Sequence, residues 1–208
     1  MKYRHLIWDF DGTLFNTYPR ICRAYMKALA DAGIVEEEDV LLRSIKKTLE
    51  YTNEWVGAKY GLTQEQRWEG YHRHSEEEGY DTMLPYPGMT DFLRDAHDAG
   101  CAHYVYTHRG ESTIKALEHF GLTSLFTDCI TNLYGFAHKP CPDALNFLIA
   151  RHGLDKKDCV MIGDREIDVM AGVNAGIASI AMDPDGLCPP GLPAPYVHSY
   201  EDLRKLIL

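Results

Sequence analysis

Apolar residues recur along the chain in two different rhythms, and these rhythms predict its elements of secondary structure. From Gly88 onward, short runs of consecutive apolar residues alternate with longer segments in which apolar positions recur every three or four residues. The short runs are typical of strands buried on both faces, and the longer segments are typical of amphipathic helices. Parallel strands need crossover connections of this kind, so the alternation predicts an α/β fold, a doubly wound parallel sheet with a Rossmann-like core.

Turn and capping residues set the expected bounds of these elements. Glycine closes several helical segments, as at Gly100, Gly121 and Gly153, and Pro142 suits the first turn of another. The expected strands cover residues 5–8, 102–107, 128–131, 159–164, 178–182 and 196–197. The expected helices cover residues 90–99, 112–120 and 141–152. One further helix is expected to end near residue 176, and a last one at residue 208.

The segment between the first strand and Pro85 shows helical spacing only. A first helix is expected to begin at Asn16 or Thr17, whose side chains suit an N-cap, and to end near Gly33. Further helical stretches are expected over residues 36–51, 55–60 and 63–78.

Two features bound this helical segment. Thr63 followed by Gln66 is the pattern of a capping box, and Pro85, Pro87 and Gly88 mark a hinge at the end of the segment. We therefore expect two domains, an α/β core domain formed by residues 1–14 and 86–208 and a small helical cap domain formed by residues 15–85.

Composition and charge exclude several classes of protein. The 208 residues carry a formal net charge of −10, which argues against nucleic acid as a partner, because phosphodiester backbones need clustered Lys and Arg. No apolar run approaches the length of a membrane span, and no signal-peptide stretch precedes the first strand, so we expect a cytoplasmic protein that does not bind membranes. The six cysteines are scattered and lack the paired spacing of a zinc site.

Polar side chains collect where the predicted strands end. Ligands of an open parallel sheet bind beyond the carboxyl ends of its strands. Asp9 and Asp11 follow the first strand with the spacing of two side chains that point the same way, and Gly12 and Thr13 then turn the chain and offer backbone N–H groups to an anion. Further polar residues are expected at the same edge: Thr107, Lys139, Asp164 and Asp168.

This set of residues suits phosphoryl transfer through an aspartate. The carboxylates of Asp9, Asp164 and Asp168 form a hard oxygen site of the kind that Mg²⁺ prefers. Thr107 and Lys139 suit the phosphoryl oxygens. Asp11, beside the Asp9 nucleophile, suits the exchange of protons with the leaving alcohol and with water.

Four ordered motifs in the chain resemble those of the haloacid dehalogenase-like hydrolase superfamily. They are Asp-Phe-Asp-Gly-Thr-Leu at 9–14, Thr107 at a strand end, Lys139-Pro140, and Gly-Asp-Arg-Glu-Ile-Asp at 163–168. The helical insert resembles the cap of the subgroup that includes phosphoglycolate phosphatases and β-phosphoglucomutases.

The resemblance implies a role for each motif residue. Asp9 is the expected nucleophile, and Asp11 is the expected general acid/base, with its backbone carbonyl on Mg²⁺. The expected phosphate-binding residues are Gly12, Thr107, His108 and Lys139, and the expected metal residues are Asp9, Asp11, Asp164 and Asp168.

Departures from the family pattern bear on which reaction is expected. Dehalogenases lack the second acid, here Asp11, and mutases carry a histidine one turn after the threonine that corresponds to Thr17, where this chain has Ile21. We therefore expect a Mg²⁺-dependent phosphatase that hydrolyses a small-molecule phosphomonoester through an aspartyl-phosphate, similar to phosphoglycolate phosphatase. The alternatives are a sugar-phosphate mutase and, outside enzymes, a phospho-accepting receiver-type module or a binding-only module.

The sequence leaves the substrate and the oligomeric state open. Phosphoglycolate phosphatases usually have Asp-Ser where this chain has Asn16 and Thr17, so the resemblance does not assign that substrate. Asn16, Arg20 and Arg109 are the candidates for substrate specificity, and Arg109 has two interpretations, contact with an anionic substrate group or simple solvation.

Overall fold

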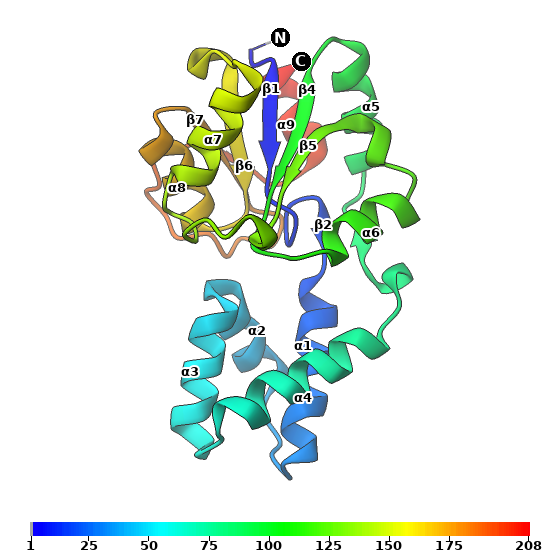
Figure 1. Cartoon of the computed structure of the whole chain (residues 1–208), viewed down its shortest axis with the longest axis vertical. Helices are drawn as coiled ribbons and strands as arrows, with labels where there is room; N and C mark the ends of the chain where they lie inside the picture. The colour runs from blue at the N-terminus through cyan, green and yellow to red at the C-terminus, as the bar shows by residue number, and fades with distance from the viewer. Residues whose placement is uncertain (1) are drawn as a thin grey trace. The chain divides into compact units, whose positions relative to one another are not determined.

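The computed structural model describes residues 2–208 and contains a six-stranded sheet. The strand order is β5-β4-β1-β6-β7-β8, and neighbouring strands in it are parallel (Figure 1). Strands β1 (His5–Trp8), β4 (Ala102–Tyr106) and β6 (Cys159–Gly163) form its middle. The predicted α/β class with a doubly wound parallel sheet is confirmed.

The remaining elements follow the expected alternation closely. The sheet also contains β5 (Phe126–Ile130), β7 (Ala178–Met182) and β8 (Tyr196–Val197), and its helices are α5 (Met89–Asp98), α6 (Ser112–His119), α7 (Asp143–His152), α8 (Glu166–Ala175) and α9 (Tyr200–Ile207), with short 3-10 turns at Thr123–Leu125, Asn132–Tyr134 and Lys156–Asp158.

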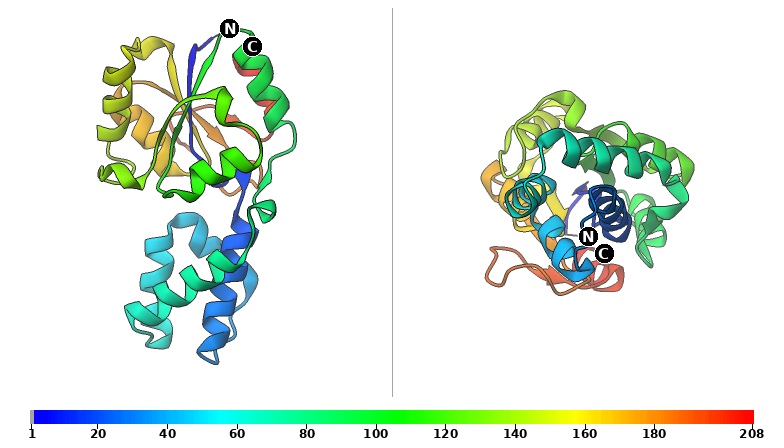
Figure 2. Two further views of the ribbon diagram at one scale, coloured as in Figure 1. Left: turned by 45° about the vertical axis from the view of Figure 1, so that its right-hand side comes forward. Right: turned by 90° about the horizontal axis from the view of Figure 1, so that it is seen from below.

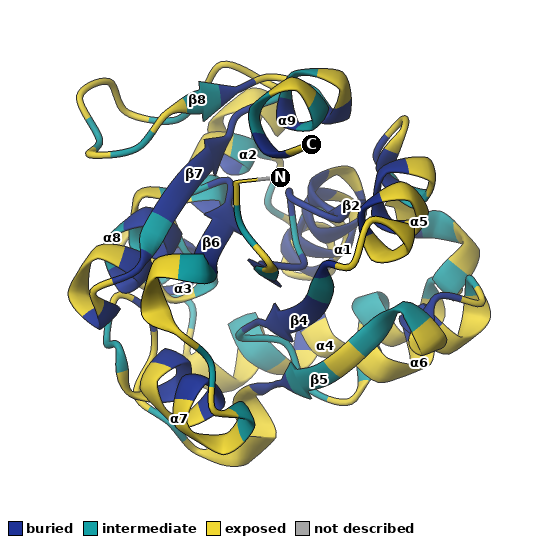
Figure 3. Cartoon of the chain, turned by 90° about the horizontal axis from the view of Figure 1, so that it is seen from above, coloured by how far each residue is buried: buried dark blue, intermediate teal, exposed yellow. Residues whose placement is uncertain are grey.

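Helices cover both faces of this sheet because successive strand residues point to opposite sides. Ile7 and its register partners Tyr104 and Met161 lie in one core cluster with α7 and α8. Trp8, the next residue of β1, instead contacts Phe92 of α5 and stacks on Tyr200 of α9. Two views show these layers (Figure 2), and the central strands are buried while the helices expose their outer sides (Figure 3).

The chain divides into two compact units. The first comprises the described residues of Met1–Phe15 together with Pro85–Leu208, and the second comprises Asn16–Leu84. The strands β2 (Phe15–Asn16) and β3 (Leu84–Pro85) pair at the two points where the chain leaves and re-enters the first unit. None of the helices within residues 2–208 is both long enough and apolar enough to span a bilayer.

The second unit is a helical bundle around α1. Its elements are α1 (Tyr18–Asp31), α2 (Glu38–Lys47), α3 (Leu49–Tyr60), α4 (Gln64–Glu77) and the 3-10 turn Tyr80–Thr82. Helix α1 contacts both α2 and α4, and Tyr25 of α1 stacks on Tyr71 of α4 with ring centroids 4.8 Å apart. The expected capping box at the start of α4 is confirmed, because Thr63 accepts from the Gln66 amide and Gln66 accepts from the Thr63 amide.

Two sequence predictions about this unit are wrong. The helix expected over residues 36–51 ends at Lys47, because Thr48 adopts an extended conformation and caps α3 by accepting a hydrogen bond from the Tyr51 amide. Thr17 occupies the N-cap position of α1, but its side chain makes no capping hydrogen bond. No glycine or proline lies near Thr48, so the usual signals of a helix boundary are missing there.

A buried histidine links β4 to β1 and α5. His103 is 0% exposed; Trp8 Nε1 donates to its Nδ1 at 3.1 Å, and its Nε2 lies 3.0 Å from the Leu93 carbonyl. A neutral ring protonated at Nε2 satisfies both contacts, whereas a charged ring has no acceptor for Trp8. Burial lowers the pKa of His103 to about 4, with a smaller contribution from His97.

The neutral state of His103 should make stability depend on pH. The folded pKa of about 4 lies below the ordinary 6.5, so the unfolded chain binds more protons between these values. The resulting stabilisation is present above about pH 6.5 and is lost as the pH falls through about 4, with a limit of about 3 kcal/mol. Urea unfolding from pH 7 to pH 4.5 should show a steeper loss of free energy for the wild type than for His103→Gln. Equal pH dependence of the two proteins would contradict this.

Candidate active site

The strand order brings three sequence-predicted residues to one edge of the sheet. Asp9 follows β1, Thr107 follows β4 and Asp164 follows β6, and β1 lies between the other two strands (Figure 1). The pairing continues past the strand ends, since Asp9 N donates to the Ile162 carbonyl at 2.8 Å and Thr107 N donates to the Ile130 carbonyl at 3.0 Å. Backbone hydrogen bonds therefore position the first polar residue after β1 and after β4.

Three buried carboxylates gather at this edge. Asp9, Asp164 and Asp168 each offer an oxygen within 4.8 Å of the other two, and they are 1%, 5% and 0% exposed. Asp168 comes from the first turn of α8, whose close approach requires glycine at the end of β6: a Cβ at Gly163 would lie 2.2 Å from the Asp168 Cβ. Gly163 therefore makes room for the third carboxylate.

Lys139 lies inside this carboxylate cluster. Its Nζ donates to Asp9 Oδ1 at 2.6 Å and to Asp168 Oδ1 at 2.7 Å, and its side chain is fully buried. The Tyr106 ring is 4.6 Å from the same Nζ. One ammonium group thus bridges two carboxylates, one that follows strand β1 and one from helix α8.

Arg165 is a second cation at the cluster, and sequence reasoning missed it. Its guanidinium lies 3.7 Å from Asp9 Oδ2, 3.8 Å from Asp164 Oδ1 and 3.6 Å from Asp168 Oδ2. Its backbone N–H also donates to Asp168 Oδ2 at 3.1 Å, which fixes the start of α8. Its position between Asp164 and Asp168, two acids about one helical turn apart, is the sequence signal that could have predicted this role.

The pKa values of the cluster follow from burial and from these charges. Burial and, to a smaller extent, Asp168 raise the pKa of Asp9 to about 6 against the opposing effects of Lys139 and Arg165. Burial also opposes ionisation of Asp168, but Lys139 and Arg165 outweigh burial and lower its pKa. Burial disfavours the Lys139 ammonium as well, and Asp168 and Asp9 outweigh that effect and raise its pKa. Of the two carboxylates that contact Lys139, Asp9 is therefore the one whose ionised form is stabilised less by its surroundings.

Asp11 lies in a separate ion pair beside the cluster. Arg109 Nε donates to Asp11 Oδ1 at 2.8 Å and to Oδ2 at 3.0 Å, and Arg109 Nη1 donates to Ser112 Oγ at 3.1 Å. The Arg109 side chain is only 12% exposed, so the interpretation of Arg109 as a solvated residue is wrong. Sequence reasoning missed this pair, because no motif spacing links the loop after β4 to Asp11.

His108 contacts the lysine segment. Lys139 N donates to His108 Nε2 at 2.8 Å, and the His108 ring stacks on His138 with centroids 4.3 Å apart. Burial lowers the pKa of His108 to about 3, assisted by Lys139 and Arg165, so the ring is neutral and can accept this hydrogen bond. The side chain of His108 thus holds the backbone of Lys139 in place.

The sequence predictions for Gly12 and Arg20 need correction. Gly12 turns the chain at a φ of 77°, a conformation that favours glycine, but its N–H donates to the Phe15 carbonyl at 2.8 Å and is not offered to an anion. Arg20 is buried, and its Nη2 donates to the carbonyls of Ser75 and Glu78 at the end of α4. Asn16, the other candidate in the second unit, is exposed on β2.

The three carboxylates of the cluster fit a hard divalent cation. Asp9 Oδ2 is buried and has no hydrogen-bond partner among residues 2–208, which leaves a lone-pair site directed into the cluster. Carboxylate oxygens are the ligands that Mg²⁺ prefers, and a metal there would offset the repulsion that raises the pKa of Asp9. Thr107 Oγ1 accepts from the Arg109 amide at 3.1 Å, so its hydroxyl hydrogen remains available to an anion.

Comparison with known proteins gives a family match over most of the chain. A family model described as haloacid dehalogenase-like hydrolase matches residues 6–182. A phosphoglycolate phosphatase from Aliivibrio fischeri is 27% identical over 197 residues, which cover 85% of this chain and 82% of that protein. A pyrophosphatase, PpaX, from Halalkalibacterium halodurans is 26% identical over 189 residues, with coverages of 85% and 82%.

A solved structure has the same fold. It comes from Haemophilus somnus, is described as a predicted phosphoglycolate phosphatase, and matches 100% of this chain and 99% of its own with a TM-score of 0.84. The two sequences are 20% identical, so this likeness bears on the fold alone.

Removal of Lys139 should destabilise the protein more than loss of an ordinary lysine. Lys139→Met leaves Asp9 and Asp168 buried without the ammonium group that bridges them, and we expect a loss of about 3–5 kcal/mol of unfolding free energy. The control is Lys157→Met, because Lys157 pairs with Asp155 in an exposed ion pair, so its removal should cost much less unfolding free energy. Urea unfolding at pH 7 without divalent cations measures both values. Similar losses would show that the buried bridge does not support the fold.

Proposed function

The chain belongs to the haloacid dehalogenase-like hydrolase family, and from this premise we propose that it is a Mg²⁺-dependent phosphatase that hydrolyses a small-molecule phosphomonoester through an aspartyl-phosphate. The observation that carries the proposal is the buried carboxylate cluster of Asp9, Asp164 and Asp168 bridged by Lys139. A group of acids held at the edge of a parallel sheet suits metal-assisted attack on a phosphate dianion.

In this proposal Asp9, Asp164 and Asp168 hold Mg²⁺, together with the backbone carbonyl of Asp11 that the family pattern implies. When bound, the ion supplies positive charge that offsets the repulsion between a carboxylate nucleophile and the phosphate dianion. The Asp9 oxygen without a hydrogen-bond partner supports this role. Lys139 and the Thr107 hydroxyl then bind phosphoryl oxygens.

The first chemical step transfers the phosphoryl group to Asp9. A carboxylate oxygen of Asp9 forms a bond to phosphorus as the bond from phosphorus to the leaving oxygen breaks, and Asp11 donates a proton to that oxygen. Lys139, already in contact with Asp9 and Asp168, stabilises the charge on the transferring group. The products of this step are the free alcohol and a phosphorylated Asp9.

The second step returns the enzyme to its starting state. Asp11, now ionised, takes a proton from water as the water oxygen attacks phosphorus, and the bond from phosphorus to Asp9 breaks to release phosphate. The bifurcated hydrogen bond from Arg109 Nε to both oxygens of Asp11 holds this carboxylate in one orientation during the proton exchange. In this scheme Arg109 is a positioning residue, and Asp9 and Asp11 are the catalytic residues.

Hydrolysis is proposed over mutase transfer because of one residue in the second unit. Ile21, at the position where the mutase pattern has histidine, is 4% exposed and belongs to the apolar core around α1. A proton-transfer group is therefore missing at that position. The similarity to proteins named phosphoglycolate phosphatase and pyrophosphatase supports a small phosphate compound as the substrate.

We also propose that the enzyme works in the cytoplasm. All six cysteines are free thiols in the structure, which suits a reducing compartment. Burial raises the pKa of the Cys22 and Cys159 thiols to about 11, so both behave as small apolar residues.

Loss of the nucleophile should abolish activity. Asp9→Asn removes the attacking carboxylate, and we expect hydrolysis of 4-nitrophenyl phosphate with Mg²⁺ to fall by at least about 10³-fold. Asp155→Asn changes an exposed aspartate and serves as the matched control. EDTA should abolish wild-type activity, and added Mg²⁺ should restore it. Full activity of Asp9→Asn, or activity in EDTA, would contradict the proposed mechanism.

The substrate and the type of reaction can be tested together. Phosphate release should be measured over a panel of metabolite monoesters that includes phosphoglycolate, with pyrophosphate as a further candidate. A hexose 1-phosphate with a bisphosphate activator should give free phosphate only. An isomerised hexose phosphate as the product would overturn the assignment to hydrolysis in favour of the mutase.

Arg109 should affect kcat more than KM. Arg109→Gln releases the Asp11 carboxylate from its fixed orientation, and we expect kcat to fall by about 10- to 100-fold, a fraction of the usual contribution of general acid–base catalysis. Arg151→Gln alters an arginine that lies outside the cluster and is the control. A rise in KM at constant kcat would instead assign Arg109 to substrate binding.

A further inference from the structure

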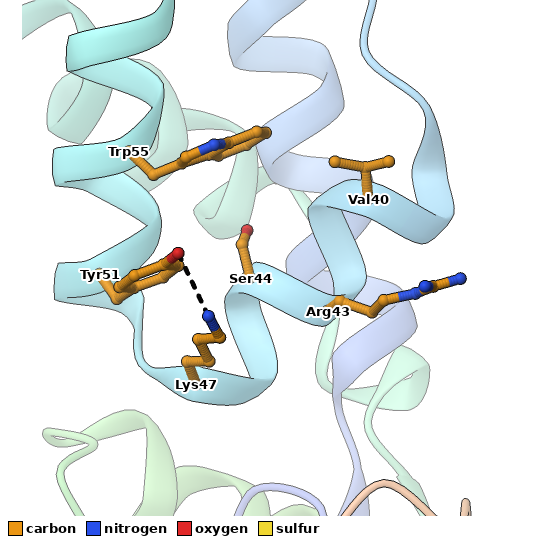
Figure 4. Close-up of a pocket in the computed structure, with 6 residues that line it drawn as sticks. All are labelled: Val40, Arg43, Ser44, Lys47, Tyr51 and Trp55. Atoms are coloured by element: carbon orange, nitrogen blue, oxygen red, sulfur yellow. Dashed lines mark hydrogen bonds between the residues drawn. The ribbon is translucent and has the colours of Figure 1, made fainter.

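A pocket in the second unit lies outside the carboxylate cluster. It has a volume of about 270 Å³ and is lined by Val40, Arg43, Ser44, Lys47, Tyr51 and Trp55. This volume is slightly below the range usual for small-molecule sites, so the pocket fits a compact metabolite and not a dinucleotide. Figure 4 shows the Tyr51 and Trp55 rings on the α3 side and Val40 and Ser44 on the α2 side.

The residues that line this pocket come from one face of α2 and one face of α3, which are consecutive in the chain. Residues 40, 43, 44 and 47 recur at helical spacing on α2, and Tyr51 and Trp55 lie one turn apart on α3. Thr48 joins the two helices directly, and Thr52 Oγ1 lies 3.2 Å from Ser44 Oγ, which ties α3 to α2 at the base of the pocket. The pocket walls are therefore fixed by the fold of the second unit alone.

Lys47 provides positive charge at one end of the pocket. Its Nζ donates to Tyr51 Oη at 3.2 Å and lies 4.3 Å from the centre of that ring (Figure 4). Among residues 2–208, no acidic side chain pairs with Lys47, and an ammonium group has three donors, of which Tyr51 uses one. Donors of Lys47 thus remain for a ligand, next to the phenolic oxygen.

Three other basic residues of this unit differ from Lys47 in this respect. Arg23 pairs with Glu78, Lys59 pairs with Glu36, and Arg73 pairs with Asp31. In a chain with a net charge of −10, a lysine that has no acidic partner, lies over an aromatic ring and lines a pocket is an unusual local environment. It matches a ligand that brings its own negative charge.

We propose that this pocket binds a small organic anion, with its carboxylate or phosphate on Lys47 Nζ and Tyr51 Oη and its planar body against Trp55. An aromatic wall favours a flat apolar group, and the ammonium and phenol favour an anionic group at one end of it. Arg43 lines the rim, and its guanidinium points away from both rings (Figure 4). The anion therefore depends on Lys47 and not on the general positive charge of α2.

A binding measurement tests the pocket without catalysis. Phenylphosphonate is a suitable probe, because it carries a planar ring and an anionic group that a phosphatase does not hydrolyse. Binding is followed by NMR through the indole N–H of Trp55, one of three tryptophans in the chain, assigned with Trp55→Phe. We expect a saturable shift of this signal, and methylphosphonate, which has no ring, should bind at least tenfold more weakly.

Two variants on α2 form a matched pair. Lys47→Gln and Arg43→Gln each remove one positive charge from an exposed position, so both should fold normally. Lys47→Gln should weaken phenylphosphonate binding at least tenfold, whereas Arg43→Gln should change it less than threefold. The absence of a saturable Trp55 shift, or equal weakening by the two variants, would overturn the proposal.

Steady-state kinetics show whether the bound anion is part of the substrate or a separate effector. Of the experiments on this pocket, only this kinetic comparison rests on the proposed phosphatase function. If the pocket holds the leaving group of the substrate, Lys47→Gln should raise KM for phenyl phosphate but not for methyl phosphate. If the anion is a separate effector, Lys47→Gln should weaken phenylphosphonate binding to the same extent and leave both KM values unchanged. Either result supports binding of an anion in the pocket and identifies the source of that anion. The NMR result does not depend on catalysis and holds even if the enzyme hydrolyses neither ester.

Discussion

The Lys139 ammonium between Asp9 and Asp168 is the contact on which the rest of the site depends. Two carboxylates this close repel each other, and burial strengthens the repulsion, so they can stay ionised only beside fixed positive charge. Lys139 contacts both, and Arg165 faces all three acids of the cluster from the start of α8. The acids, the two cations and the helix that carries Asp168 therefore form one electrostatic unit.

Residues around this unit hold the groups that the proposed chemistry uses. His108 holds the Lys139 backbone, Arg109 holds the Asp11 carboxylate, and Gly163 leaves the space that Asp168 fills. Each of these contacts is made between groups of the protein itself. Such prior placement reduces the reorganisation needed during reaction, which is the main way that proteins stabilise charge in a transition state. These three residues thus position the side chains that carry the reacting atoms and do not react themselves.

Sequence reasoning located the carboxylates and Lys139 because strand ends of a parallel sheet converge at one edge. It missed contacts that depend on the path of loops. The sequence allows two interpretations of Arg109, because its contact with Asp11 depends on the tertiary structure. The prediction for the Gly12 amide is wrong because the turn directs this N–H to the Phe15 carbonyl, and the sequence does not specify that turn. The break at Thr48 was missed because a single threonine can end one helix and cap the next without glycine or proline.

The central claim is that Asp9 carries the phosphoryl group during turnover. The most direct test uses Asp11→Asn with acetyl phosphate, a donor whose leaving group needs no proton, so that phosphorylation proceeds while attack by water is slowed. After an acid quench in the presence of Mg²⁺, mass spectrometry of the digested protein should find one phosphoryl group on the peptide that contains Asp9. An unmodified Asp9 peptide, or a phosphoryl group on another residue, from a protein whose wild type hydrolyses the same donor would contradict the claim.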